Sequence, residues 1–346
     1  MTAFSDAVCT AESITGKRIT EEAAAELICK MKGKRVLILS HRHPDGDTLG
    51  CALALKQILK GLGSKADIAC ADPAPSNCRF LFDGRNGAVA EPAPLLNPAP
   101  DDYDKIVSVD TASTKQLGIL SFLSDRVCLK IDHHAVGEDY AKENLVDPDA
   151  AACAEIIMRI AKIIGTPLKD IMTPLYAGIS SDTGGFKYSN TTSKTLRFAA
   201  ELMDEGVDCG YINHMLFDNH TMSEIRAIRT AYENLELFEN GKVALITVTN
   251  EKKKENGLSD SDLGVLSSLS RDIEGVLLGI VLKQDASDEK KYRISMRSSE
   301  PVDVAEICSK LNGGGHVRAA GGEIIADSVK EAVNTVLCTV KESVKF

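Results

Sequence analysis

Short segments rich in histidine and aspartate are the part of this sequence that could carry out chemistry. The first is HRHPDGD, which places His41, Asp45 and Asp47 within seven residues, directly after an apolar run. Crowded carboxylates repel one another, and the repulsion disfavours their charged forms unless cations lie between them. Imidazole and carboxylate donors without thiolates suit Mn²⁺, and Mg²⁺, Co²⁺ or Fe²⁺ would also fit. The segment therefore predicts a divalent-metal site.

Three further segments could contribute to the same site. VSVDTAS contains Asp110, IDHH contains Asp132, His133 and His134, and ISSDTGGF contains Asp182. Taken singly, each has a simpler explanation: a helix N-cap, a surface histidine pair and a turn. Ligands of open α/β sheets, however, bind beyond the carboxyl ends of the strands, where these segments are predicted to lie. We expect the four segments to converge, so that two metal ions could activate a water molecule for phosphoryl chemistry.

The elements that would position these residues alternate between strands and helices. Strands are predicted at 35–40, 66–70, 105–109 and 127–131, and helices at 49–61, 152–164, 172–180 and 193–205. The run RVLILS is apolar at most positions, as expected of a strand buried on both faces of a parallel sheet. This alternation predicts an α/β domain.

The order of elements changes in the last third of the chain. Strands are predicted at 243–249, 276–282 and 292–297, and helices at 302–311 and 328–344, after a polar helical segment at 223–238. This order predicts a smaller α+β domain. We place the N-terminal catalytic domain at 1–215, a connector at 216–240 and the C-terminal domain at 241–346.

A glycine-rich segment in the C-terminal part could bind an anion. NGGGHVRAAGG has five glycines in eleven residues and lacks the Gly-Lys-Ser/Thr ending of a P-loop. Such a backbone can bring N–H groups close to a phosphate, whereas a helix C-cap and a turn would account for only one or two of the glycines. Arg297 ends the preceding strand and could bind an anion with both arms of its guanidinium, although alone it would be a surface residue. We interpret His214 and His220 as structural or solvated.

Composition limits the classes of function that are possible. The chain has 346 residues, 44% of them hydrophobic and 26% charged, which is typical of a folded protein of about two domains. Its net charge of −10 argues against a protein that coats long duplex nucleic acid. It has no apolar run of roughly eighteen residues, so we expect no membrane-spanning helix. The N-terminus does not resemble a signal peptide, and the ten cysteines form no CxxC pair, so we expect a cytoplasmic protein with reduced thiols.

The four segments rich in histidine and aspartate, taken in their order along the chain, closely resemble the motifs of the DHH phosphoesterase family. NGGGHVRAAGG resembles the signature of the DHHA1 domain that often follows. The resemblance implies an N-terminal parallel-sheet DHH domain and a smaller α+β DHHA1 domain, with the active site in the cleft between them. It also implies two Mn²⁺ ions per active site. By position, His41 and Asp45 would bind one ion, Asp47, His133 and Asp182 would bind the other, and Asp110 would bridge them.

The resemblance implies roles for the remaining residues as well. His134 would contact the scissile phosphate or assist the leaving group, and Asp132 would orient an imidazole. The other phosphate or the sugar of the substrate would be bound by Arg297, His316 and the backbone of Gly313, Gly314 and Gly315. Cys51 stands where relatives commonly have serine, and we expect it to serve helix packing.

Within the family, this chain resembles one branch in its compact length and its DHHA1 ending. Members of that branch degrade short oligoribonucleotides (nanoRNA) and convert 3′-phosphoadenosine 5′-phosphate (pAp) to AMP. Two alternatives stay open: a phosphodiesterase for cyclic di-AMP or linear dinucleotides, and a non-catalytic nucleotide sensor. A sensor should have lost metal ligands, whereas all six are in place. The resemblance alone implies a possible homodimer, and we expect no membrane partner.

Overall fold

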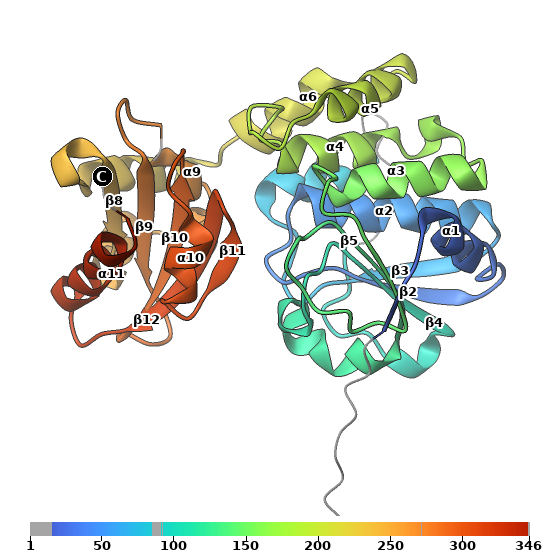
Figure 1. Cartoon of the computed structure of the whole chain (residues 1–346), viewed down its shortest axis with the longest axis horizontal. Coiled ribbons are helices and arrows are strands. Elements are labelled where there is room, and N and C mark those ends of the chain that lie inside the picture. The colour runs from blue at the N-terminus through green and yellow to red at the C-terminus, as the bar shows by residue number, and fades with distance from the viewer. Residues whose placement is uncertain (1–15, 85–90, 92, 271, 345–346) are drawn as a thin grey trace, which may run out of the picture. The chain divides into compact units, whose positions relative to one another are not determined.

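The computed structural model in Figure 1 describes residues 16–84, 91, 93–270 and 272–344. The chain divides into two compact units between Asn219 and His220. Each unit is built on its own six-stranded sheet. Most of the N-terminal segment that was compared with a signal peptide, including Cys9, lies outside the described residues.

The sheet of the first unit has the strand order β1-β6-β5-β4-β2-β3. Its strands are β1 (Lys17–Arg18), β2 (Arg35–Leu39), β3 (Lys65–Ala69), β4 (Lys105–Val109), β5 (Val127–Asp132) and β6 (Glu143–Val146). Every pairing between neighbours is parallel. The predicted parallel α/β domain is confirmed. The sequence analysis missed β1 and β6, which are too short to give a periodic pattern.

Both faces of this sheet are covered, which explains why most residues of the central strands β2 and β4 are apolar. The helices of the unit are α1 (Glu21–Cys29), α2 (Gly46–Gly61), α3 (Cys153–Ile164), α4 (Met172–Asp182), α5 (Ser193–Asp204) and α6 (Cys209–Asn213). Val36 and Ile38 of β2 pack in the core that contains residues of α1 to α4. Leu37 and Leu39 pack in a smaller core with the 3₁₀-rich segment Thr114–Arg126.

Glycines allow α2 and α4 to pack closely. A Cβ atom at Gly50 would lie 2.3 Å from the carbonyl oxygen of Pro174. A Cβ atom at Gly178 would lie 2.7 Å from Oδ1 of Asp47. Because α2 begins beside Asp47 and α4 ends at Asp182, this packing brings the two carboxylate-bearing helix ends together.

The second unit has the strand order β11-β12-β10-β9-β8-β7, in which only the β8–β9 pairing is parallel. Its strands are β7 (Leu235–Phe238), β8 (Val243–Val248), β9 (Leu278–Gln284), β10 (Lys291–Ser298), β11 (Gly314–His316) and β12 (Ala319–Ile325). Its helices are α7 (Met222–Glu233), α8 (Asn250–Asn256), α9 (Leu266–Leu269), α10 (Val304–Ser309) and α11 (Val329–Ser343). The α+β prediction is confirmed. The segment expected as a connector contains α7 and β7, and β7 pairs with β8.

The glycine-rich segment of this unit forms a hairpin of β11 and β12 instead of an open loop. A Cβ atom at Gly313 would lie 1.9 Å from the carbonyl oxygen of Gly321, and one at Gly322 would lie 2.5 Å from that of Leu311. Gly315 has a φ of +144°, which side chains rarely allow. Close packing of the hairpin therefore accounts for most of these glycines, and anion binding by the segment stays a prediction.

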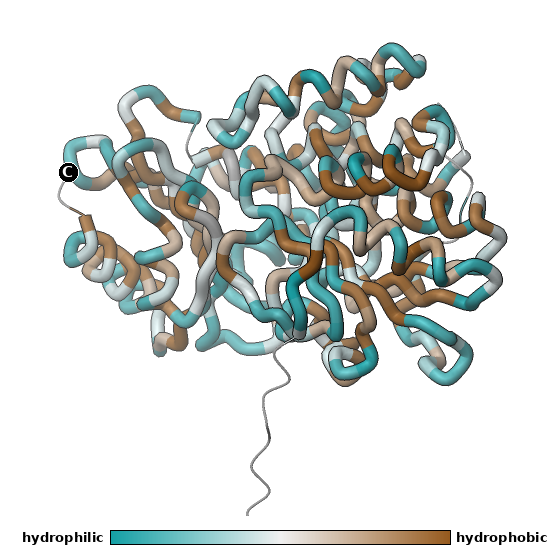
Figure 2. Tube along the Cα trace, turned by 45° about the vertical axis from the view of Figure 1, so that its right-hand side comes forward, coloured by the Kyte–Doolittle hydropathy of each residue, from teal (hydrophilic) through white to brown (hydrophobic). Residues whose placement is uncertain are grey.

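Hydrophobic residues concentrate in the strands and in the inner faces of the helices of each unit (Figure 2). Within the described ranges, no helix combines the length and the hydrophobicity that crossing a bilayer requires. The described cysteines carry free thiols, as expected.

Substitution of Gly50 by alanine tests the close packing of α2 on α4. The methyl group would meet a backbone carbonyl, so we expect Gly50→Ala to lower the free energy of unfolding by about 1–3 kcal/mol. Gly61→Ala is the matched control, because Gly61 is exposed in the same helix and a Cβ atom there meets nothing within 4 Å. We expect the control to stay within ~1 kcal/mol of the wild type. Urea unfolding in EDTA, followed by circular dichroism, measures both, and equal stability of the two variants would contradict the packing argument.

Candidate metal centre and active site

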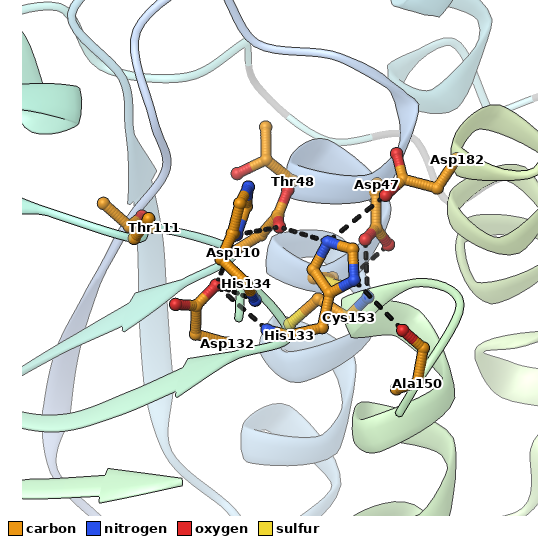
Figure 3. Close-up of polar contacts among 12 residues, drawn as sticks. Asp47, Thr48, Asp110, Thr111, Asp132, His133, His134, Ala150, Cys153 and Asp182 are labelled. Atoms are coloured by element: carbon orange, nitrogen blue, oxygen red, sulfur yellow. Dashed lines mark hydrogen bonds and ion pairs between the residues drawn. The ribbon is translucent and has the colours of Figure 1, made fainter. Parts of the chain in front are cut away.

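The candidate site lies at the carboxyl ends of β2, β4 and β5 (Figure 3). Asp110 directly follows β4, and Asp132 is the last residue of β5. Asp45 is the N-cap of α2, and Asp182 is the last residue of α4. The structure brings together the six residues predicted as metal ligands: His41, Asp45, Asp47, Asp110, His133 and Asp182.

The first donor group consists of His41, Asp45 and Asp110, whose ligand atoms all lie within 4.8 Å of one another. Nε2 of His41 is 3.4 Å from Oδ2 of Asp110 and 3.7 Å from Oδ2 of Asp45. Nδ1 of the same ring is 2.8 Å from the carbonyl oxygen of Arg42. An imidazole that donates from Nδ1 to a carbonyl presents the lone pair of Nε2, which is how metal-binding histidines are commonly oriented.

The second donor group consists of Asp47, His133 and Asp182 and has the same spread. Nε2 of His133 lies 3.3 Å from Oδ2 of Asp182 and 3.5 Å from Oδ1 of Asp110. Nδ1 of His133 is 3.2 Å from the carbonyl oxygen of Ala150, which again directs Nε2 toward the carboxylates.

Asp110 joins the two groups, because its two carboxylate oxygens face different imidazoles. Oδ2 faces His41, and Oδ1 faces His133. Oδ1 is buried and receives no hydrogen bond from the residues that the structure describes. The backbone of Asp110 has a φ of +53°, an uncommon conformation for a residue with a side chain and one that often marks functional sites. A buried oxygen without a donor, between two imidazoles, fits a carboxylate that bridges cations.

Asp47 is held by donors from two helices. Its oxygens accept hydrogen bonds from the backbone N–H groups of Cys153 at 2.6 Å and Ala154 at 2.9 Å, at the N-terminus of α3. Cys51, which we expected to serve packing alone, also places its thiol 3.4 Å from Oδ1 of Asp47. Burial nevertheless raises the pKa of Asp47 well above its usual range, and the charges of Asp110 and Asp182 add to the rise.

The histidines balance the crowded carboxylates electrostatically. Burial alone would lower the pKa of His41, but Asp45 and Asp110 raise it well above the usual value. Burial would likewise lower the pKa of His133, and Asp182 together with Asp110 raises it. Burial would raise the pKa of Asp45, yet His41 and two backbone N–H groups hold it at about 2. The cluster therefore needs positive charge, which either imidazolium ions or divalent metals could supply.

Asp132 and His134 form a dyad beside these two donor groups, and His134 also belongs to a third possible metal-binding group with Asp110 and His133. Nδ1 of His134 lies 2.7 Å from Oδ1 of Asp132, which also accepts a hydrogen bond from the backbone N–H of His133 at 2.9 Å. Burial would raise the pKa of Asp132, but the hydrogen bond with His134 and the charge of Lys130 hold it at about 2. Lys130 was missed in the sequence analysis, although a lysine inside the apolar strand VCLKID was a visible signal.

The residues predicted to bind substrate lie in the second unit. Arg297 is on β10, where its guanidinium donates a hydrogen bond to the carbonyl oxygen of Met296 at 3.0 Å. Gly313 precedes β11, and Gly314, Gly315 and His316 form that strand. His214 and His220 are exposed and lie in the first unit and at the start of the second.

Substitution of Asp182 tests whether the carboxylates bind a metal. Burial raises the pKa of Asp182, so folding disfavours its ionised form at pH values above its unfolded pKa. Asp182→Asn removes that cost, and we expect unchanged or higher stability in EDTA near neutral pH. With Mn²⁺ at a hundred times its Kd, the wild type should gain ~2.7 kcal/mol for each ion that it binds, and the variant should gain less at the same concentration.

Chemical denaturation with EDTA and with Mn²⁺ measures both effects. The control is Asp125→Asn, which alters an exposed carboxylate of the same unit and should match the wild type in both conditions. An equal gain from Mn²⁺ in Asp182→Asn and in the wild type would show that Asp182 is not a ligand.

Comparisons with known proteins agree with this geometry. A model of the DHH family, N-terminal domain, matches residues 35–179, and a model of the DHHA1 domain matches residues 240–342. The bifunctional oligoribonuclease and PAP phosphatase NrnA of Thermus thermophilus is 30% identical over 319 residues, which cover 92% of each chain. The cyclic-di-AMP phosphodiesterase GdpP of Geobacillus thermodenitrificans is 25% identical over 91% of this chain and 48% of its own length.

A solved structure shares the fold. The crystal structure of an exopolyphosphatase-related protein from Bacteroides fragilis matches with a TM-score of 0.81 at 21% identity, over 93% of this chain and 96% of that chain. The domain order, the strand-end motifs and the extent of these matches agree with one another. The chain thus belongs to the DHH phosphoesterase family and carries both its N-terminal DHH domain and its DHHA1 domain.

Proposed function

We propose that this protein is a metal-dependent phosphohydrolase that degrades short oligoribonucleotides to mononucleotides and dephosphorylates pAp to AMP. The observation that carries the proposal is that Asp110, a member of the first donor group, also places Oδ1 3.5 Å from Nε2 of His133 in the second group. Two cation positions joined by one carboxylate are typical of enzymes that hydrolyse phosphoesters. The activity named for the Thermus thermophilus relative supports these two substrates.

We propose that the cofactor is a pair of Mn²⁺ ions, and Mg²⁺ or Co²⁺ would fit the same oxygen and nitrogen donors. His41, Asp45 and Asp110 would hold one ion, and Asp47, Asp110, His133 and Asp182 would hold the other. Bound there, the ions would supply Lewis acidity and positive charge for the attack of water on phosphorus. The N-terminus of α3 and the thiol of Cys51 would keep Asp47 in place.

His134 is proposed to contact the scissile phosphate or to give a proton to the leaving oxygen. Its Nδ1 is engaged by Asp132, so Nε2 is the nitrogen that would serve the substrate. Burial would lower the pKa of His134, but Asp132 and Asp110 raise it above the usual value. The raised pKa favours the protonated imidazole that a general acid requires. Asp132 would orient this ring.

The second unit is proposed to bind the rest of the substrate through Arg297, His316 and the backbone of Gly313, Gly314 and Gly315. Gly314 is the informative member of this set. A Cβ atom there would meet nothing within 4 Å, so the hairpin itself does not require glycine at this position. Close approach of a ligand to the backbone would give a reason for it.

The alternatives are less well supported. The cyclic-di-AMP phosphodiesterase matches at lower identity and extends over about twice the length that this chain covers. A non-catalytic sensor would not need a complete donor set, and all six predicted donors lie together. The acidic chain suits small substrates that are bound in a local pocket and disfavours long duplex nucleic acid. A cytoplasmic location and a homodimer stay predictions.

The decisive experiment measures hydrolysis of pAp, a short 5′-labelled oligoribonucleotide and cyclic di-AMP, with Mn²⁺ and with EDTA. We expect AMP from pAp and mononucleotides from the RNA only when Mn²⁺ is present. Turnover of cyclic di-AMP alone would favour the phosphodiesterase. Mn²⁺ binding without turnover of any phosphoester would favour the sensor.

Asp110→Ala tests the bridging carboxylate in the same assay. We expect folded protein with nearly all hydrolysis lost, because both donor groups lose a shared oxygen donor. Asp125→Ala removes an exposed carboxylate of the same unit and should keep wild-type rates. Retention of more than about a tenth of the wild-type rate by Asp110→Ala would rule out the bridging role.

Gly314→Ala tests the proposed substrate contact in the second unit. The methyl group does not disturb the hairpin, so we expect wild-type stability together with a KM for pAp raised about tenfold. Gly315→Ala is the comparison, because its positive φ should make that variant unstable. A wild-type KM for both substrates in a folded Gly314→Ala protein would remove Gly314 from the binding site.

A further inference from the structure

Lys130 is a buried charge that the proposed reaction does not use. It lies in β5, two residues before Asp132, and is only 1% exposed. The neighbouring Leu129 and Ile131 point into the apolar core under the helices, so Lys130 points to the opposite face of the sheet. An ammonium group is costly to bury unless it is paired and hydrogen-bonded, so its partners indicate what it does.

The partners of Lys130 come from both ends of one loop. Its Nζ atom donates to Oδ2 of Asp132 at 3.2 Å and to the carbonyl oxygen of Glu138 at 2.8 Å. The ammonium also lies 5.5 Å from the centre of the Tyr140 ring, at a distance where a cation is attracted to an aromatic face. Lys130 therefore contacts the residue that binds His134 and also the loop that follows His134.

Lys130 is the middle of a row of buried polar residues across the sheet. Ser108 of β4 and Asn144 of β6 are its neighbours in register, and neither is exposed. The hydroxyl of Tyr140 donates to Oγ of Ser108 at 2.8 Å. The side chain of Asn144 binds the backbone N–H and carbonyl of Ala141 at 3.2 and 2.8 Å. The row holds the segment 138–141 against the sheet.

The same segment is tied to the loop that follows Asp110. The backbone N–H of Glu138 donates to the carbonyl oxygen of Ala112 at 2.7 Å. The carboxylate of Glu138 accepts hydrogen bonds from the N–H and the hydroxyl of Thr114 at 2.9 and 3.0 Å. A Cβ atom at Gly137 would lie 2.5 Å from the carbonyl oxygen of Ala112, so the two loops touch. Fixing Glu138 thus fixes the loop of His134 relative to the loop of Asp110.

We infer that Lys130 is a positioning residue that sets the orientation of the His134 imidazole relative to Asp110. The inference rests on the proposed function in one respect, namely that His134 acts on the substrate. The carboxylate of Asp132 receives Lys130 on Oδ2 and the backbone N–H of His133 and Nδ1 of His134 on Oδ1. Without Lys130, Oδ2 loses this donor and the carboxylate is held through Oδ1 alone, so the orientation of His134 is less firmly fixed.

The test compares Lys130→Met, Lys130→Gln and wild type. Methionine keeps approximately the length and removes the donor, whereas glutamine keeps a neutral donor on a shorter side chain. Lys130 lies below the site and touches none of the six metal donors, so we expect KM for pAp and Mn²⁺ affinity to stay within about threefold. The kcat of Lys130→Met should fall by ~10- to 100-fold, as is usual for residues that orient a site residue, and Lys130→Gln should lie between it and the wild type.

Lys56→Met is the matched control. Lys56 forms a largely buried ion pair with Glu91, with a distance of 2.7 Å between Nζ and Oε2, and belongs to the same unit. We expect its loss to reduce stability without changing kcat per folded molecule. Bound Mn²⁺ per chain gives the folded fraction for each variant.

A spectroscopic measurement separates the orientation of the His134 imidazole from the stability of the protein and from the identity of the substrate. In protein labelled with ¹⁵N-histidine, the imidazole signals of His134, assigned by their loss in His134→Asn, should shift or broaden in Lys130→Met and less so in Lys130→Gln. Unchanged His134 signals together with wild-type kcat per folded molecule would overturn the inference. If Lys130→Met does not fold, Lys130→Gln decides by the same two readouts. If the wild type hydrolyses none of the substrates, the proposed function fails while the spectra still test Lys130.

Discussion

The repulsion among the carboxylates around Asp110 is the constraint on which the rest of the first unit depends. Parallel strands end at one edge of a sheet, so the side chains that follow them are forced together. The protein offsets this repulsion within the site. Imidazoles face the carboxylate of Asp110, and a backbone N–H group at the N-terminus of α3 donates a hydrogen bond to Asp47. The raised pKa values of Asp47 and Asp182 show that the offset is incomplete. The site is therefore built to gain stability when it binds cations.

The packing of the helices and strands of the first unit brings these carboxylates together. Gly50 and Gly178 let α4 approach α2 until the end of one helix lies beside the start of the other, which a larger residue would prevent. On the opposite face of the sheet, Ser108, Lys130 and Asn144 replace apolar residues where a hydrophobic strand pattern would continue. Through their hydrogen bonds, these polar residues fix the loop that carries His134. Stability and precision of the site are thus set on opposite faces of the same strands.

The sequence was sufficient to predict that the six proposed donors lie together, because each follows an apolar strand or lies near a helix end, and local patterns identify both. It was insufficient for Lys130, whose meaning comes from Glu138 and Tyr140, contacts that only the folded loop creates. It was also insufficient for the packing of the glycine-rich segment, where Gly313, Gly315 and Gly322 lie against backbone atoms that only the folded hairpin brings close. The thiol of Cys51 was assigned to packing because its hydrogen bond to Asp47 depends on the side-chain directions within the first turn of α2.

The charge of the chain gives the order in which the components must meet. A phosphate-rich substrate approaches a protein of net charge −10 and, at the site itself, carboxylates of which Asp45 stays ionised with a pKa of about 2. Imidazolium ions of His41 and His133 compensate only part of this charge, and they are lost as the pH rises through their pKa values. Above that range, only bound cations reverse the local sign of the field. In the proposed enzyme, bound cations would favour substrate binding as well as the chemical step, and the two affinities would be linked through the same carboxylates.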